Sequence, residues 1–185
     1  MLGMGIIMRK NLIIWGTAII LVIVAILVTS EYGKNKTAPQ INEGTMVNEK
    51  AIDFTLKDLD GNKIALSDFK GKNVYVNFFA TWCPPCRAEM PDIEKMYQKY
   101  RDKDFVFLAV DLGEDRATVK DFFESYELNF NVVLDQDQTV ARNYNITSIP
   151  VSIFIDKQGN IAAKKVGSMA GSEMELYIKM LLEQN

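Results

Sequence analysis

The chain has 185 residues, enough for one domain of ordinary size. Apolar residues make up 48% of it and charged residues 24%, a composition that excludes a disordered chain, a collagen and a low-complexity polymer. The sequence contains no histidine, which excludes His-based acid–base catalysis, Ser-His and Cys-His nucleophile pairs, haem ligation by His and most zinc enzymes.

Charge is unevenly distributed along the chain. Arg9 and Lys10 are the two charged residues among residues 1–30, so the remainder holds 19 of the 21 basic residues and all 24 acidic ones. This excess of acidic side chains argues against nucleic acid or anionic lipid as the main partner.

The N-terminal segment is strongly apolar. Residues 12–28 carry no charge, and in a helix they would rise about 26 Å, near the lower limit for crossing a bilayer's hydrocarbon core. Arg9 and Lys10 precede this stretch and Glu31 follows it, so the positive-inside rule places the rest of the chain outside the cytoplasm. We expect residues 1–30 to form a single-pass anchor in the cell membrane; a cleaved signal peptide is the alternative.

Two further regions follow the apolar segment. Residues 31–46 are polar, contain Pro39 and show little periodicity, which is typical of a tether. Residues 47–185 then form one domain of common size.

Strands and helices alternate in the predicted domain. In chain order we expect a β-hairpin over residues 53–66, a strand over 73–79, a helix over 86–100, a strand over 105–110 and a helix over 117–126. There follow a strand over 131–134, a short helix over 139–144, a hairpin of strands 151–155 and 161–166, and a helix over 172–182 capped by Ser172. The charged residues 113–116 are interpreted as a loop and helix start, with acids near the positive dipole end. This order predicts an α/β fold with a central mixed sheet flanked by helices.

The two cysteines of the chain stand in the sequence Trp82-Cys83-Pro84-Pro85-Cys86, between a predicted strand and a predicted helix. Cys83 then lies at the helix N-terminus, where unpaired N–H groups and the positive end of the dipole stabilise a thiolate. Cys86 lies almost one turn further on the same side, close enough for a disulfide. We expect Cys83 to be the exposed nucleophile and Cys86 to resolve the mixed disulfide, while Pro84 and Pro85 stiffen the loop.

Other interpretations of the cysteine pair are weaker. A zinc site needs about four ligands, and the chain has no further Cys and no His. A purely structural disulfide across four residues would give only a small entropic gain. Redox chemistry in an extracytoplasmic, oxidising compartment is the function that the pattern favours.

The segment 77–91, NFFATWCPPCRAEMP, and Ser148-Ile149-Pro150 some sixty residues later resemble the thioredoxin fold. More narrowly, they resemble the membrane-tethered TlpA/ResA-like thiol–disulfide oxidoreductases. The resemblance covers about residues 45–185. It includes the N-terminal β-hairpin and an inserted strand–helix region from Asp111 to Asp135.

The resemblance assigns roles to the loop before Pro150. Pro150 matches the family's cis-proline, although the sequence shows only an Ile–Pro bond, for which trans is the commoner isomer. In the cis form the backbone of Ile149 would be free to pair with an extended substrate. Trp82 would cover the disulfide.

The resemblance also draws attention to two polar residues. Asn77 stands where thioredoxin carries a buried Asp that transfers protons. Glu89, three residues after Cys86, matches a glutamate of ResA-like proteins, where it would raise the thiol pKa and shuttle a proton. An ordinary solvated helix charge is the alternative interpretation of Glu89.

By resemblance the chain is an enzyme on the outer face of the cytoplasmic membrane that reduces protein disulfides. A transmembrane thiol donor would recharge it, and its substrates would be apocytochrome c or other envelope or spore-coat thiols. It would need no cofactor beyond the Cys83–Cys86 disulfide and no metal. The candidate catalytic residues are Cys83, Cys86 and Glu89, and the candidate substrate-binding residues are Trp82, Pro84, Pro85, Ile149 and Pro150.

Two alternative functions remain at this point. One is a peptide-binding module whose disulfide is inert. The other is a peroxiredoxin-like peroxidase, whose signature would place Pro and Thr at the positions that hold Val76 and Ala80 here.

Overall fold

The structure is a computed structural model that describes residues 20, 22–24 and 49–183. Residues 20 and 22–24 are helical, whereas the rest of the predicted anchor and the tether over residues 31–46 lie outside the described residues. Within the described parts of the chain, no helix has the length and apolar character needed to cross a membrane. The chain divides into two compact units, residues 1–40 and 41–185, and the fold below is that of the second.

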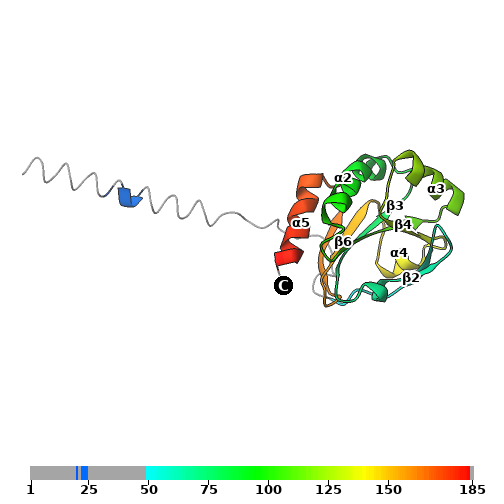
Figure 1. The fold of residues 1–185 in the computed structure, drawn as a ribbon, viewed down its shortest axis with the longest axis horizontal. Helices are drawn as coiled ribbons and strands as arrows, with labels where there is room; N and C mark the ends of the chain where they lie inside the picture. The colour runs from blue at the N-terminus through cyan, green and yellow to red at the C-terminus, as the bar shows by residue number, and fades with distance from the viewer. Residues whose placement is uncertain (1–19, 21, 25–48, 184–185) are drawn as a thin grey trace, which may run out of the picture. The chain divides into compact units, whose positions relative to one another are not determined.

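A mixed sheet of seven strands forms the centre of this unit (Figure 1). The strands run in the spatial order β2-β1-β5-β4-β3-β6-β7. β3, β4 and β5 are parallel to one another, and the remaining neighbours pair antiparallel. Their bounds are β1 Thr55–Asp58, β2 Lys63–Ala65, β3 Asn73–Phe79, β4 Phe105–Leu112, β5 Asn131–Asp135, β6 Val151–Ile155 and β7 Ile161–Val166. The predicted α/β fold with a central mixed sheet is confirmed.

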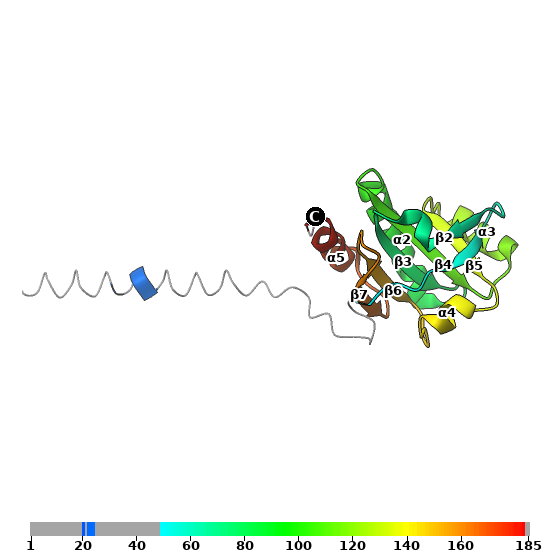
Figure 2. The ribbon, with the colours of Figure 1, turned by 90° about the horizontal axis from the view of Figure 1, so that it is seen from below.

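Helices cover both faces of the sheet (Figures 1 and 2). The helices are η1 Leu66–Phe69, α2 Pro84–Tyr100, α3 Arg116–Ser125, α4 Thr139–Asn143 and α5 Gly171–Glu183. In β3, Tyr75 and Phe79 pack in one core cluster with residues of α2, α3 and α5. The alternate residues Val76 and Phe78 pack in a second cluster with Val140 of α4. Successive side chains of a strand point to opposite faces of the sheet, and both sets of β3 side chains are buried. The C-terminal end of β3 therefore lies in the interior.

Several predicted boundaries differ from the structure by one or two residues. The first hairpin strand begins at Thr55, and Leu66 starts the short helix η1 instead of ending a strand. α2 begins at Pro84, two residues before the predicted start, since proline is compatible with the first turn of a helix.

The prediction that Ser172 caps the last helix is wrong. α5 begins at Gly171, so Ser172 lies within it. The N–H of Gly171 donates instead to Oδ2 of Asp92 in α2, at 2.8 Å. A carboxylate from a neighbouring helix therefore satisfies a free N–H at the start of α5.

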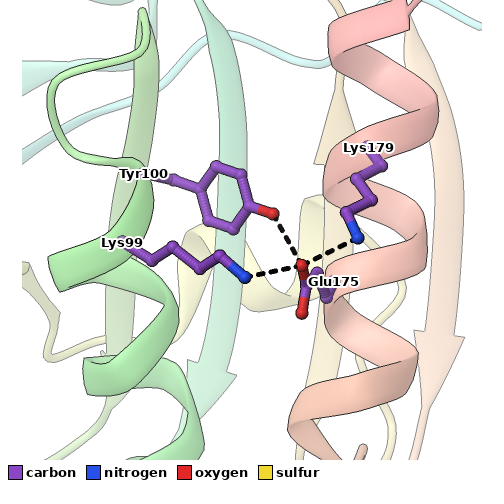
Figure 3. Close-up of polar contacts among 4 residues, drawn as sticks. All are labelled: Lys99, Tyr100, Glu175 and Lys179. Carbon is purple, nitrogen blue, oxygen red and sulfur yellow. Dashed lines mark hydrogen bonds and ion pairs between the residues drawn. The ribbon is translucent and has the colours of Figure 1, made fainter.

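The other end of the α2–α5 contact is held by a cluster of polar side chains (Figure 3). Oε1 of Glu175 in α5 lies 2.8 Å from Nζ of Lys99 and 2.9 Å from Nζ of Lys179. The hydroxyl of Tyr100 donates to the same oxygen at 2.9 Å. Lys99 and Tyr100 belong to α2, so this cluster joins the C-terminal part of α2 to α5.

Candidate active site

The cysteine pair stands at the junction of β3 and α2. β3 ends at Phe79, and the N–H of Cys83 donates to the carbonyl of Ala80 at 3.2 Å, closing a tight turn. Cys83 is the N-cap residue of α2, and the N–H of Cys86 donates to its Sγ at 3.3 Å. As the sequence predicts, the sulfur of Cys83 lies at the positive end of the helix dipole, where it accepts a hydrogen bond from a backbone N–H of the first turn.

The two sulfurs form a disulfide, with the Cα atoms 5.3 Å apart. Cys86 is fully buried, and the side chain of Cys83 is only 3% exposed. The prediction of an exposed Cys83 is therefore wrong for the disulfide form. The carbonyl oxygen of Ile149 lies 3.8 Å from Sγ of Cys83, so the loop before Pro150 packs onto this sulfur.

The loop before β6 brings a second predicted part of the site to the disulfide. The Ile149–Pro150 peptide bond is cis, the isomer that the resemblance implies. Pro150 is buried and Ile149 is half-buried. Among the described residues, the N–H of Ile149 has no hydrogen-bond partner. The backbone of Ile149 thus offers an unused donor next to the disulfide.

The remaining predicted substrate-binding residues lie on the surface around the cysteine pair. Trp82 is 67% exposed, and Pro84 and Pro85 are exposed in the first turn of α2. Together they give the buried disulfide an apolar border that faces solvent.

Glu89 lies in α2, three residues after Cys86, and only 2% of its surface is exposed. Its Oε1 accepts a hydrogen bond from Nδ2 of Asn77 at 2.8 Å, and its Oε2 accepts one from the N–H of Met169 at 3.1 Å. The alternative of a solvated surface charge is wrong for this residue. Burial raises the pKa of Glu89 from 4.5 to about 7, and the two hydrogen bonds oppose that increase.

Tyr75 and Ser152 complete a buried polar cluster with Asn77 and Glu89. Nδ2 of Asn77 also lies 3.3 Å from the hydroxyl of Tyr75 and from Oγ of Ser152, and these two hydroxyls lie 2.9 Å apart. Burial and the charge of Glu89 raise the pKa of Tyr75 well above its usual value, so its hydroxyl keeps its proton. Oδ1 of Asn77 is buried without a partner in the described part of the chain.

The sequence interpretation misses several members of this cluster. Ser152 interrupts an otherwise apolar strand, which is a usable signal, since a buried hydroxyl needs a partner. Nothing local indicates that the N–H of Met169, eighty residues away, completes the environment of Glu89.

The charged loop after β4 is more than a helix start. Asp115 does cap α3, accepting from the N–H of Thr118. Glu114 instead turns toward Thr81, just before the cysteine pair, and the fully buried Asp111 lies beside it. In the described residues, no group of three or more His, Cys, Asp or Glu side chains could hold a metal ion.

Residues 47–164 match the AhpC/TSA family. The thiol-disulfide oxidoreductase ResA of Bacillus thuringiensis subsp. konkukian (strain 97-27) is 33% identical over 174 residues, covering 94% of this chain and 99% of that protein. ResA of Bacillus subtilis (strain 168) is likewise 33% identical, over 94% of this chain and 95% of its own length. The chain belongs to the AhpC/TSA family and is a ResA-like thiol–disulfide oxidoreductase.

Solved structures agree with the ResA-like assignment. A putative thiol:disulfide interchange protein DsbE from Chlorobium tepidum has a TM-score of 0.69 and 32% identity, covering 74% of this chain and 97% of its own. StoA from Bacillus subtilis has a TM-score of 0.61 and 27% identity, over 69% and 96% of the two chains. The ResA-like enzyme therefore has the thioredoxin-like fold, and its substrates are proteins that contain disulfides.

Proposed function

We propose that this ResA-like enzyme reduces protein disulfides on the outer side of the cytoplasmic membrane, with residues 1–30 as its anchor. The uncharged stretch over residues 12–28 and the preceding Arg9 and Lys10 support this location. In this proposal residues 31–46 form the tether and residues 47–185 the thioredoxin-like domain.

The observation that carries the proposed chemistry is the position of Sγ of Cys83 on the first turn of α2. The N–H of Cys86 donates to this sulfur, and the same contact would stabilise a thiolate in the dithiol form. The Cys83 thiolate attacks a substrate disulfide, a new S–S bond forms between Cys83 and the substrate, and one substrate thiolate leaves and takes up a proton.

Cys86 completes the exchange. Its thiolate attacks Sγ of Cys83, the bond to the substrate breaks, and the second substrate thiolate leaves. Two electrons and two protons have then passed from the enzyme dithiol to the substrate disulfide. Glu89, on the same face of α2, takes the proton of the Cys86 thiol, a role suited to a carboxyl with a pKa of about 7.

Substrate binding involves the border of the disulfide. The free N–H of Ile149 pairs with the backbone of an extended substrate segment beside Pro150, while Trp82, Pro84 and Pro85 provide an apolar contact surface. The backbone bonds would hold the substrate sulfur close to Cys83.

The surroundings of Cys86 support the proposed direction, from enzyme dithiol to substrate disulfide. This sulfur is fully buried, and Glu89 adds a carboxyl near it, and both features disfavour a thiolate. The stabilisation of a thiolate is therefore limited to Cys83, whereas strong oxidants owe their high reduction potential to a strongly stabilised reduced form. We therefore propose a reductant, recharged by a transmembrane thiol donor, and apocytochrome c as its substrate, with other envelope or spore-coat thiols as the alternative.

The experiment that tests this function is a trapping experiment with the full-length protein in native membranes. Cys86→Ser should accumulate mixed disulfides between Cys83 and substrate proteins, and Cys83→Ser, the matched control, should accumulate none. Identification of the captured proteins decides between apocytochrome c and other substrates. An inert disulfide in a peptide-binding module would give no captured protein with either variant.

The reduced wild-type protein tests the peroxidase alternative. Val76 and Ala80 are buried, and neither carries a hydroxyl that could bind a peroxide. We expect hydrogen peroxide to oxidise the reduced enzyme much more slowly than a protein disulfide does. Faster oxidation by peroxide would contradict the proposed exchange function.

A further inference from the structure

Two carboxyl groups lie behind the turn that carries Cys83. Asp111 is in β4, where it pairs in register with Phe79, the last residue of β3. Glu114 follows β4 after Gly113, which has a φ of +85°. This left-handed conformation, which favours glycine, lets the chain turn sharply between Asp111 and Glu114.

Glu114 holds the second residue of the active-site turn. Its Oε2 accepts from the N–H of Thr81 at 2.5 Å, and its Oε1 accepts from the hydroxyl of Thr81 at 2.6 Å. Both donors of Thr81 therefore bind the two oxygens of one carboxyl group. The turn that these bonds hold runs from Ala80 to Cys83. The side chain of Glu114 therefore helps to position the backbone that carries the reactive sulfur.

Asp111 in turn holds Glu114. It is fully buried, and its Oδ1 accepts from the N–H of Glu114 at 3.1 Å. Its Oδ2 is buried without a partner in the part of the chain that the structure describes. The two residues beside it on the neighbouring strands, Phe79 and Leu134, carry no charge, and the charged group that acts on it is Glu114.

A proton on Asp111 would turn its buried Oδ2 from an acceptor without a partner into a hydrogen-bond donor. Burial, together with the side chain of Glu114, raises the pKa of Asp111 to about 8. At neutral pH Asp111 is therefore a carboxylic acid, and its proton can bridge to the Glu114 carboxylate. The pair holds one proton and one negative charge, as two adjacent carboxyl groups in a buried site generally do.

We propose that Glu114 is a positioning residue for Cys83, and that Asp111 keeps it in place through a shared proton. The proposal rests on the dithiol–disulfide exchange proposed above. Glu114 holds the turn at Thr81. Asp111, in its neutral form, adds no second negative charge beside Glu114 and can donate a hydrogen bond to it. When Asp111 also loses its proton, the two carboxylates repel each other and the hold on the turn weakens.

Single-turnover kinetics of the full-length reduced protein test this role, with an aromatic disulfide reagent as the probe. Glu114→Gln should slow the attack of Cys83 by about tenfold or more at neutral pH, because a displaced nucleophile loses its alignment. Asp115→Asn is the matched control: it removes the same charge one residue away, and Asn caps a helix as well as Asp does. We expect its rate to equal that of the wild type.

The pH profile separates positioning from a merely structural role. The wild-type rate should rise as the thiol ionises and then decline above about pH 8, and Asp111→Asn should lose that decline. A Glu114→Gln rate equal to that of the wild type would overturn the positioning role, and a decline that persists in Asp111→Asn would overturn the shared proton. If the wild type itself does not react, the proposed exchange function fails, which is a distinct result.

Discussion

Glu89 and Glu175 both join α2 to the segment that contains α5, but they do so at opposite ends of the contact and in opposite electrostatic surroundings. Glu89 is buried, and its neighbours Asn77 and Met169 are uncharged, so its pKa rises to about 7. Hydrogen bonds from Lys99, Lys179 and Tyr100 lower the pKa of Glu175 to about 2 (Figure 3).

The difference shows what each carboxyl can do. A group that titrates near neutral pH can accept and release a proton during thiol exchange, whereas a group that stays ionised at every physiological pH can only attract its cations. Glu89, near Cys86, is thus suited to proton transfer during thiol exchange, whereas Glu175 is suited to holding α2 and α5 together.

The largest expected effect separates the two glutamates directly. Glu89→Gln should slow exchange with a protein disulfide by about tenfold to a hundredfold and remove the ionisation near pH 7 from the rate profile. Glu175→Gln is the control on the partner helix and should leave the rate unchanged. Stopped-flow measurement of the exchange rate of both variants checks this. An equal decrease in rate for the two variants would contradict a special role for Glu89.

Glu89 also makes stability depend on pH. Its pKa is raised on folding, so its favourable contribution is complete below about 4.5 and is lost as pH rises through about 7. Between pH 4.5 and pH 7 the free energy of unfolding of the oxidised wild type should therefore fall by about 3 kcal/mol relative to that of Glu89→Gln. Urea unfolding of both proteins at several pH values measures the difference, and parallel curves would contradict it.

A second variant sharpens the description of the buried end. Asn77→Asp places another carboxyl within hydrogen-bond distance of Glu89, where the two groups must share a proton. We expect an additional loss of about 2 kcal/mol in the free energy of unfolding at pH 8 compared with pH 5. Asn77→Ala adds no charge but removes a hydrogen bond that lowers the pKa of Glu89, so its loss of stability should also be larger at pH 8 than at pH 5, though the difference should be smaller than that of Asn77→Asp.

The local patterns of the sequence were sufficient for the site's framework. A β-branched and aromatic run over residues 73–79 and an amphipathic pattern over residues 86–100 place Cys83 at a helix start, and the structure agrees. Both signals depend on neighbours within a few residues, so they survive without knowledge of the tertiary fold. The roles of Glu89 and Ile149 came from the resemblance, since spacing alone shows neither the buried carboxyl nor the contact with Sγ.

What could not be predicted depends on contacts between distant segments. Ser172 has the side chain of a good cap, but the N–H of Gly171 donates instead to Asp92, which lies seventy-nine residues before Gly171 in α2. Asp111 follows an apolar run and gives no local sign that β4 continues over it and buries it. The exposure of Cys83 depends on Ile149, which approaches it only in the folded chain.

Asp92 provides a test of intermediate size at the same end as Glu89. Asp92→Ala removes the acceptor for the N–H of Gly171, and we expect a loss of about 1 kcal/mol in stability, typical of a lost helix cap. Asp92→Asn keeps an acceptor oxygen and should recover most of that loss. Thermal unfolding measures both, and equal losses would indicate that the charge of Asp92 matters more than its hydrogen bond.

The smallest expected effect belongs to the far end of the contact. The pKa of Glu175 is lowered on folding, so its contribution is complete above about 4.5 and disappears as pH falls through about 2. Glu175→Gln should lower the melting temperature slightly at neutral pH, and the difference from the wild type should vanish in strong acid. Because Lys99 and Lys179 remain exposed to solvent, high salt should reduce the same difference. A difference that persists in acid would mean that Glu175 acts through packing of its side chain and not through its charge.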